Sequence, residues 1–148
     1  LAAEMEAELI HEFGFPAGVI TRSESDMERL VGFLAELQRE LPALSYQRNT
    51  VFLRFCHADY HKGSALSELA RLLEIPARGI FVAGDDYNDL PMLDRRHAGF
   101  IACPANAVER VKETVRAAGG YIASEPCSLG VLEAIRHFRN GNGHSRPG

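Results

Sequence analysis

The stretch GIFVAGDDYND, residues 79–89, places a continuous apolar run directly before a group of acidic residues. The apolar run at 79–83 is typical of a strand that is covered on both faces of a parallel sheet. The carboxylates of Asp85, Asp86 and Asp89 and the amide of Asn88 follow it closely. Because ligands of open α/β sheets bind outside the carboxyl ends of the strands, this cluster is predicted to lie at a binding crevice.

The concentration of negative charge at this strand end predicts a bound cation. Neighbouring carboxylates repel one another and resist desolvation unless a positive charge joins them. A Mg²⁺ ion is the simplest solution, since hard cations take oxygen ligands and keep several waters. Gly84 would allow a sharp turn that projects Asp85 into the crevice. The alternative is structural, because Asp and Asn are also favoured in turns and as helix N-caps.

A lysine upstream favours the binding interpretation. In HADYHKGSAL, residues 57–66, Lys62 stands at the start of a predicted helix. The helix macrodipole disfavours a cation there, so local helix stability does not explain this residue. A lysine at that place could instead reach and neutralise a phosphate beside the backbone amides of the turn. Lys62 and the acidic strand end together predict a site for Mg²⁺ and phosphate.

Helices and strands alternate from residue 62 onward, which predicts an α/β domain with a mainly parallel sheet. Leucines 66, 69, 72 and 73 are expected to form the apolar core face of the first helix. The expected helices are 62–75, 106–120 and 128–138, the expected strands are 79–84, 98–104 and 121–124, and a short helix or turn is expected at 88–96.

The first third of the chain has a mixed pattern. Apolar residues at helical spacing predict a helix at 1–13, and capping residues followed by an amphipathic pattern predict another at 23–41. A short strand is expected at 17–20, and one or two strands at 44–56. A boundary is expected near residues 56–61.

Composition excludes several classes of partner. The chain has 148 residues, a net charge of −4 and a pI near 5.9, which argues against a nucleic-acid or anionic-membrane partner. Its apolar runs are far shorter than the roughly 20 residues that span a bilayer. Cys56, Cys103 and Cys127 are odd in number and widely spaced, which predicts reduced thiols in a cytoplasmic protein.

Three segments in this order carry a family resemblance: KGSAL (62–66), IFVAGDDYNDLPML (80–93) and ACPANAVERVK (102–112). Over residues 56–138 the chain resembles the C-terminal half of haloacid dehalogenase (HAD) superfamily phosphatases, in their Cof-type and sucrose-phosphate-phosphatase-like branch. The resemblance implies a partial Rossmann-like HAD core at 56–139 and the remaining part of an α+β cap domain at 1–55. Residues 140–148 are expected to form a disordered tail.

The resemblance also implies an activity. Members of that family are Mg²⁺-dependent phosphohydrolases in which an aspartate takes the phosphoryl group and water then cleaves the aspartyl-phosphate. Lys62 matches the catalytic lysine that neutralises and binds the phosphoryl group, and Asn88 matches an amide that contacts it. Asp85 and Asp89 match the metal-site carboxylates, while Asp86 falls at a variable position. The implied substrate is a sugar phosphate or a similar small phosphorylated metabolite.

The nucleophile that the family uses is not evident in the sequence. Its Asp-x-Asp motif has no match, and the nearest stretch, Asp59-Tyr60-His61, has a histidine where the acid/base aspartate should be. We therefore expect the chain to be the C-terminal portion of a longer protein. The strand at 79–83 would then have an open edge and pair with a missing N-terminal segment or with a second copy.

Two alternatives remain from the residues themselves. His57 and His61 have a spacing that binds zinc on a helix, but here they fall in a strand-to-helix loop without a third ligand nearby. The chain could also be a catalytically incomplete fragment, subunit or pseudoenzyme that binds Mg²⁺, phosphate or a partner chain.

Overall fold

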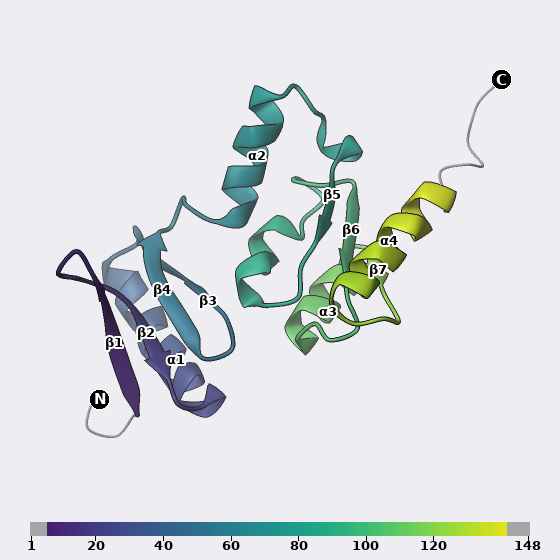
Figure 1. Cartoon of the computed structure of the whole chain (residues 1–148). Helices are drawn as coiled ribbons and strands as arrows, with labels where there is room; N and C mark the ends of the chain where they lie inside the picture. Colours follow the sequence, from purple (N-terminus) through teal and green to yellow (C-terminus); the bar gives the residue numbers. More distant parts are fainter. Residues whose placement is uncertain (1–5, 142–148) are drawn as a thin grey trace. The chain divides into compact units, whose positions relative to one another are not determined.

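The computed structural model describes residues 6–141 and divides the chain into two compact units, Leu1–His61 and Lys62–Gly148 (Figure 1). Each unit has its own buried apolar cluster.

The first unit is an antiparallel sheet with one helix. Its elements are β1 (Ala7–Glu12), β2 (Phe15–Thr21), α1 (Glu24–Glu40), β3 (Leu44–Arg48) and β4 (Phe52–His57). The strands lie in the order β1-β2-β4-β3, and every neighbouring pair is antiparallel. The buried apolar side chains of the unit come from α1, β2 and β4: Val19, Met27, Leu30, Leu34 and Leu53.

Most of the elements predicted for this unit are confirmed. The helix begins after Ser23, whose hydroxyl accepts a hydrogen bond from the Asp26 amide at 3.1 Å, as an N-cap residue does. Strands are present where 17–20 and 44–56 predicted them.

The helix predicted for 1–13 is wrong within the described residues, because Ala7–Glu12 is strand β1; residues 1–5 lie outside them. Phe13 and Gly14 join β1 to β2 with φ angles of 53° and 82°. Two successive left-handed residues form the tight turn that antiparallel strands favour. Pairing with β2 therefore overrides the helical spacing of a few apolar residues.

The second unit is an α/β layer structure. Its elements, in chain order, are α2 (Lys62–Leu72), η1 (Ala77–Gly79), β5 (Phe81–Ala83), η2 (Tyr87–Met92), β6 (Phe100–Cys103), α3 (Glu109–Ala117), β7 (Tyr121–Ile122) and α4 (Cys127–Gly141), where η marks a 3₁₀-helix. The strands lie in the order β5-β6-β7 and are all parallel. The predicted α/β class and parallel sheet are confirmed.

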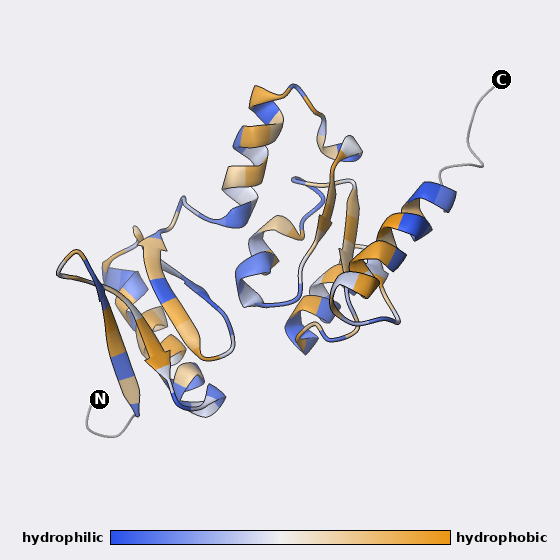
Figure 2. Ribbon diagram, viewed as in Figure 1, coloured by the Kyte–Doolittle hydropathy of each residue, from blue (hydrophilic) through white to orange (hydrophobic). Residues whose placement is uncertain are grey.

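Helices α3 and α4 cover opposite faces of this sheet. Phe81 and Phe100 contact Phe138 of α4, with ring centroids 6.1 and 5.2 Å apart. Val82 and Ile101, the next residue of each strand, point to the other face. On that face they join a buried cluster that includes Leu93, Cys103, Ala107, Val111 and Val115. Figure 2 shows β5 and β6 as predominantly hydrophobic ribbons.

Two expectations about this unit need correction. The apolar face predicted for α2 is buried only in part, because Leu66 packs on the core while Leu69, Leu72 and Leu73 are 53%, 62% and 58% exposed. The start of the predicted disordered tail, Asn140 and Gly141, completes α4; the rest of the tail, 142–148, lies outside the described residues. Among residues 6–141, no helix combines the length and apolar character needed to cross a membrane.

Candidate active site at the end of strand β5

The buried carboxylate of Asp89 is the centre of the arrangement after β5. Its Oδ1 accepts a charged hydrogen bond from Lys62 Nζ at the start of α2. Its Oδ2 accepts from the backbone amides of Asp85, at 2.9 Å, and Asp86, at 3.3 Å. Only 6% of the Asp89 side chain is exposed, against 43% of Lys62. One carboxylate therefore joins the first turn of α2 to the loop that follows the strand.

The close packing of Asp89 explains the glycine before the acidic residues. A Cβ atom on Gly84 would lie 2.4 Å from Asp89 Cβ and 2.9 Å from Asp89 Oδ2. The φ angle of Gly84 is not in the left-handed region that favours glycine. The glycine is therefore needed because the carboxylate comes so near its backbone, and the sharp turn expected from the sequence is not the reason.

Asp85 is fixed through its backbone and exposed at its side chain. Its amide donates to Asp89, and its carbonyl oxygen accepts from the amide of Val108 at 2.9 Å. Val108 belongs to the loop between β6 and α3, so this loop and η2 together hold the residue. The Asp85 carboxylate faces solvent at the carboxyl end of the strand, where a cation or phosphate could reach it.

Asp86 and Asn88 have different surroundings. Asp86 is the N-cap of η2: its Oδ1 accepts from the Tyr87 amide at 2.7 Å, and together with Asp89 it forms a capping box. The structural interpretation of the acidic cluster therefore holds for Asp86. Asn88 lies within η2, half-buried, immediately before Asp89.

The two aspartates predicted to bind metal differ in whether a carboxylate oxygen is available to a cation. Both oxygens of Asp89 already accept hydrogen bonds, whereas the exposed Asp85 carboxylate can give an oxygen to a cation. No three His, Cys, Asp or Glu side chains of residues 6–141 are grouped so as to hold a metal by themselves. Mg²⁺ is commonly held by one or two carboxylates together with waters and substrate phosphate, so the residues present fit that ion.

Residues 24–139, well over half of the chain, match the sequence profile of a family described as sucrose-6F-phosphate phosphohydrolase. The chain belongs to the sucrose-6F-phosphate phosphohydrolase family. The predicted membership of the HAD superfamily, in its sucrose-phosphate-phosphatase-like branch, is confirmed.

Solved structures and curated relatives agree with this family. The sucrose-phosphatase of Synechocystis sp. PCC6803, in complex with sucrose and phosphate, superposes with a TM-score of 0.68 at 18% identity, over 93% of this chain and 59% of that chain. BT1666 of Bacteroides thetaiotaomicron, studied among phosphatases of the HAD superfamily, gives a TM-score of 0.59 at 25% identity, over 83% and 42%. The phosphoglycolate phosphatase of Methanosarcina acetivorans is 36% identical over 83 residues, which are 56% of this chain and 34% of that protein. The chain thus spans about a third of the length of the curated relatives it matches.

His57 and Asp59, before α2, contact each other in the loop after β4. The ring of His57 accepts a hydrogen bond through Nδ1 from the Asp59 amide at 3.2 Å, so it caps the loop after β4. The Asp59 side chain is 83% exposed and belongs, with His57, to the first unit of this family member.

The surroundings of the cysteines and of Asn106 indicate structural roles for these residues. All three cysteines are free. Burial raises the pKa of the Cys103 thiol at the end of β6, so this thiol is poorly suited to nucleophilic chemistry. Asn106 Oδ1 accepts from the Cys127 amide at 2.6 Å, which fastens the loop between β6 and α3 to the start of α4.

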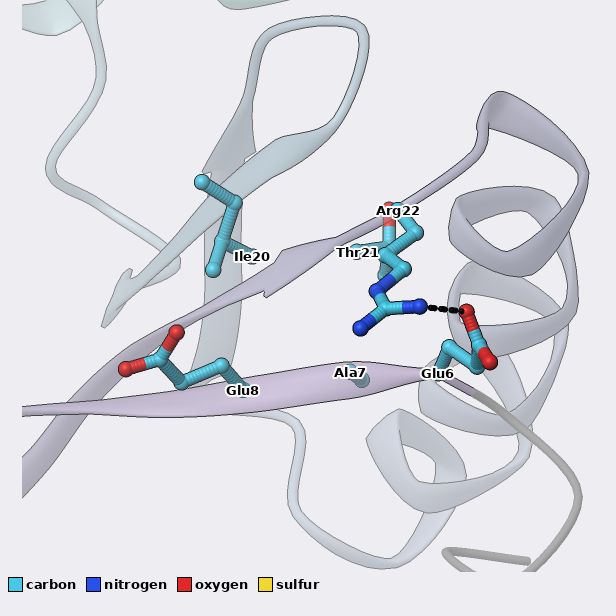
Figure 3. Close-up of a pocket in the computed structure, with 6 residues that line it drawn as sticks. All are labelled: Glu6, Ala7, Glu8, Ile20, Thr21 and Arg22. Carbon is cyan, nitrogen blue, oxygen red and sulfur yellow. Dashed lines mark hydrogen bonds and ion pairs between the residues drawn. The ribbon is translucent and has the colours of Figure 1, made fainter.

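A hollow on the first unit is a weaker candidate for a phosphate site. Its volume is about 480 Å³, and it lies beside the paired ends of β1 and β2 (Figure 3). Arg22 Nη1 is already paired with Glu6 at 2.7 Å, and Glu8 adds a second acid to the lining. The lining has a net negative charge, which would repel a phosphate.

Sequence reasoning missed one residue that packs against α2. His97, after η2, lies against the first turn of α2 and hydrogen-bonds to Ser67. No motif marks this histidine, because its role depends on the packing of two segments that are distant in sequence.

Proposed function

We propose that this chain carries one wall of the active site of a Mg²⁺-dependent phosphomonoester hydrolase. The observation that supports it best is the hydrogen-bonded set of Lys62, Asp89 and Asp85 at the carboxyl end of β5. Membership of the sucrose-6F-phosphate phosphohydrolase family favours a sugar phosphate as substrate, and the phosphoglycolate phosphatase relatives widen this to small phosphorylated metabolites. The first unit would be part of a substrate-selecting cap domain.

Each residue has a separate task in this proposal. The Lys62 ammonium neutralises the oxygens of the phosphoryl group, and Asp89 holds that ammonium in place. The Asn88 amide hydrogen-bonds to the same phosphoryl group. The exposed Asp85 carboxylate would hold Mg²⁺, which when bound neutralises charge on the phosphoryl oxygens. Asp89 supports this ligand through the Asp85 amide.

The reaction would proceed in two displacements. An aspartate oxygen attacks phosphorus, the bond from phosphorus to the ester oxygen breaks, and the alcohol leaves with a proton. Water then attacks the same phosphorus, which releases inorganic phosphate and restores the carboxylate. We place this aspartate outside the 148 residues, because the sequence contains no Asp-x-Asp motif.

The open edge of β5 supports the pairing of this strand with a further strand. Among residues 6–141, β5 pairs with β6 and no strand lies on its other side. A hollow of about 330 Å³, lined by Phe81, Phe100, Ile135, Phe138 and Arg139, lies on the same face of the sheet as α4. Unpaired backbone groups beside apolar side chains favour pairing with a strand from an N-terminal segment or from a second copy.

Light scattering and hydrogen exchange test this pairing. We expect a dimer, or a monomer whose amides at 79–83 exchange rapidly until the missing strand is added. A monomer with slow exchange at 79–83 would contradict the open edge.

The binding test uses the chain itself, because its own turnover of an aryl phosphate should be negligible. We expect Asp85→Asn to weaken Mg²⁺ binding, measured calorimetrically with inorganic phosphate present, by more than about tenfold. The fold of this variant should be unchanged. The control is Asp59→Asn, which should bind Mg²⁺ as the unmodified chain does. Equal Mg²⁺ affinity of the Asp85 variant and the unmodified chain would contradict the assignment of Asp85 as a metal ligand.

The second candidate is a chain without catalysis that binds Mg²⁺, phosphate or a partner. The missing Asp-x-Asp motif favours it. The coding sequence upstream of Leu1 decides between the two, because an Asp-x-Asp motif there would complete a phosphatase. Robust turnover by the chain that Asp59→Asn abolishes would instead overturn our placement of the nucleophile.

We also propose a cytoplasmic location. Its support is the three free thiols, one of them buried and one exposed. Alkylation of all three in fresh cell extract, without reductant, would fit this location; a disulfide found there would contradict it.

A further inference from the structure

The first turn of α2 lies unusually close to the end of η2. A Cβ atom on Gly63 would lie 2.3 Å from the carbonyl oxygen of Pro91 and 2.9 Å from Nε2 of His97. Gly63 is buried, and it has no left-handed φ angle that would require glycine. Glycine is therefore needed at this position because it lets α2 and η2 approach each other closely.

The His97 ring extends along one turn of α2. Its Nδ1 lies 2.7 Å from Ser67 Oγ, at hydrogen-bond distance, while its Nε2 faces Gly63. Residues four apart lie on the same face of a helix, so one imidazole spans both positions. The backbone of His97 is itself held, because its amide donates to the Asp94 carbonyl at 2.9 Å.

Few other contacts fix the position of α2. Leu69, Leu72 and Leu73, in and just after its C-terminal half, are more than half exposed. Within the second unit, α2 packs mainly against η2, together with the contact of Leu66 with the core. The contacts of Gly63 and Ser67 therefore govern where the helix begins.

We propose that His97 is a positioning residue for Lys62. It sets the rotation and axial position of α2, and so places the Lys62 ammonium on Asp89, which is in η2. This inference rests on the proposed function only for what Lys62 does to a phosphoryl group. The placement of the ammonium can be measured without any turnover.

The composition of the chain allows a direct measurement. Lys62 and Lys112 are the only lysines, so lysine labelled with ¹³C at Cε gives two side-chain signals by NMR. Lys112, on α3, serves as the internal reference. Asp89→Asn defines the position of the Lys62 signal when the ion pair is lost.

We expect His97→Ala to move the Lys62 signal most of the way to the Asp89→Asn position. Ser67→Ala should move it by a smaller amount, and His97→Asn, which can still hydrogen-bond to Ser67, should restore part of the original position. The matched control is Arg96→Ala, whose side chain is 80% exposed and should leave the signal in place. In every variant the Lys112 signal should stay unchanged.

A Lys62 signal that stays at its original position in folded His97→Ala would overturn the proposal. Should that variant unfold, an unmoved signal in Ser67→Ala would overturn it equally. Titration with inorganic phosphate and Mg²⁺ separates this result from the proposed function. If phosphate leaves the Lys62 signal of the unmodified chain unmoved, the phosphate role fails while the effect of His97 is judged independently.

Discussion

At the scale of single residues, the site depends on how closely one side chain approaches a backbone. Asp89 accepts from a lysine and from two amides at once, and Gly84 leaves room for its carboxylate. Substitution at the glycine should therefore disturb the site even though glycine has no chemistry of its own.

We expect Gly84→Ala to lower the free energy of unfolding by about 1–3 kcal/mol, as overpacking of a filled interior does. The added methyl group would push Asp89 from its amide donors and from Lys62. Urea unfolding followed by circular dichroism measures the change. Gly32→Ala on α1, where a Cβ meets no atom within 4 Å, should instead stabilise by about 0.5–1 kcal/mol. Equal effects of the two substitutions would contradict this account.

The candidate residues Lys62, Asp85 and Asp89 could be singled out from the sequence, but the hydrogen bonds among them could not. Lys62 and the acidic cluster are recognisable because their residue types are unusual for a helix start and a strand end. The bonds from Asp89 to the backbone, the reason for Gly84 and the position of His97 depend on packing. No local pattern carries that information.

At the scale of elements, the buried strands and the capped helix could be predicted, because continuous apolar runs and an N-cap serine are strong local signals. Strand β1 could not, since its apolar residues are few and its partner strand decides its conformation. The exposure of the leucines of α2 could not be predicted either, because an apolar stripe does not reveal which part of it other elements cover.

Helix α4 supplies a pH-dependent contact to β7. Glu133 accepts hydrogen bonds from the Tyr121 hydroxyl at 2.6 Å and from the Ser124 and Glu125 amides. The Tyr121 hydrogen bond is the main cause that lowers the pKa of Glu133 to about 2. A carboxyl group with a lowered folded-state pKa contributes stability above its unfolded pKa, and that contribution is lost as the pH falls towards the folded value.

We expect Glu133→Gln to be less stable than the unmodified chain at pH 7, and the difference to shrink between about pH 5 and pH 2. Urea midpoints measured at several pH values give the comparison. Glu113→Gln, which alters an exposed ion pair with Arg110 on α3, is the control and should change stability little. A difference that stays constant down to pH 2 would contradict the role of the Glu133 charge.

At the scale of the whole molecule, the chain consists of two units with separate cores. Leu53 is fully buried in the first and Ile101 in the second. Because the clusters share no residue, we expect each unit to respond mainly to substitutions in its own core.

Leu53→Ala should destabilise the first unit by about 2–5 kcal/mol, as cavities in cores do, and leave the second protected. Ile101→Ala should instead destabilise the second unit and leave the first protected. Hydrogen exchange followed by mass spectrometry reports both units at once. Loss of protection throughout the chain in both variants would mean that the units unfold together.

The Lys62–Asp89 pair also has a consequence for the order of folding. It joins residues 27 apart in sequence, and the chain between them must form most of α2, η1 and β5. Contacts that close long loops form after local ones, because the entropy of closure must be offset first. The pair should therefore appear after α2 has formed locally, and the Lys62 signal would report when α2 and η2 have come together during folding.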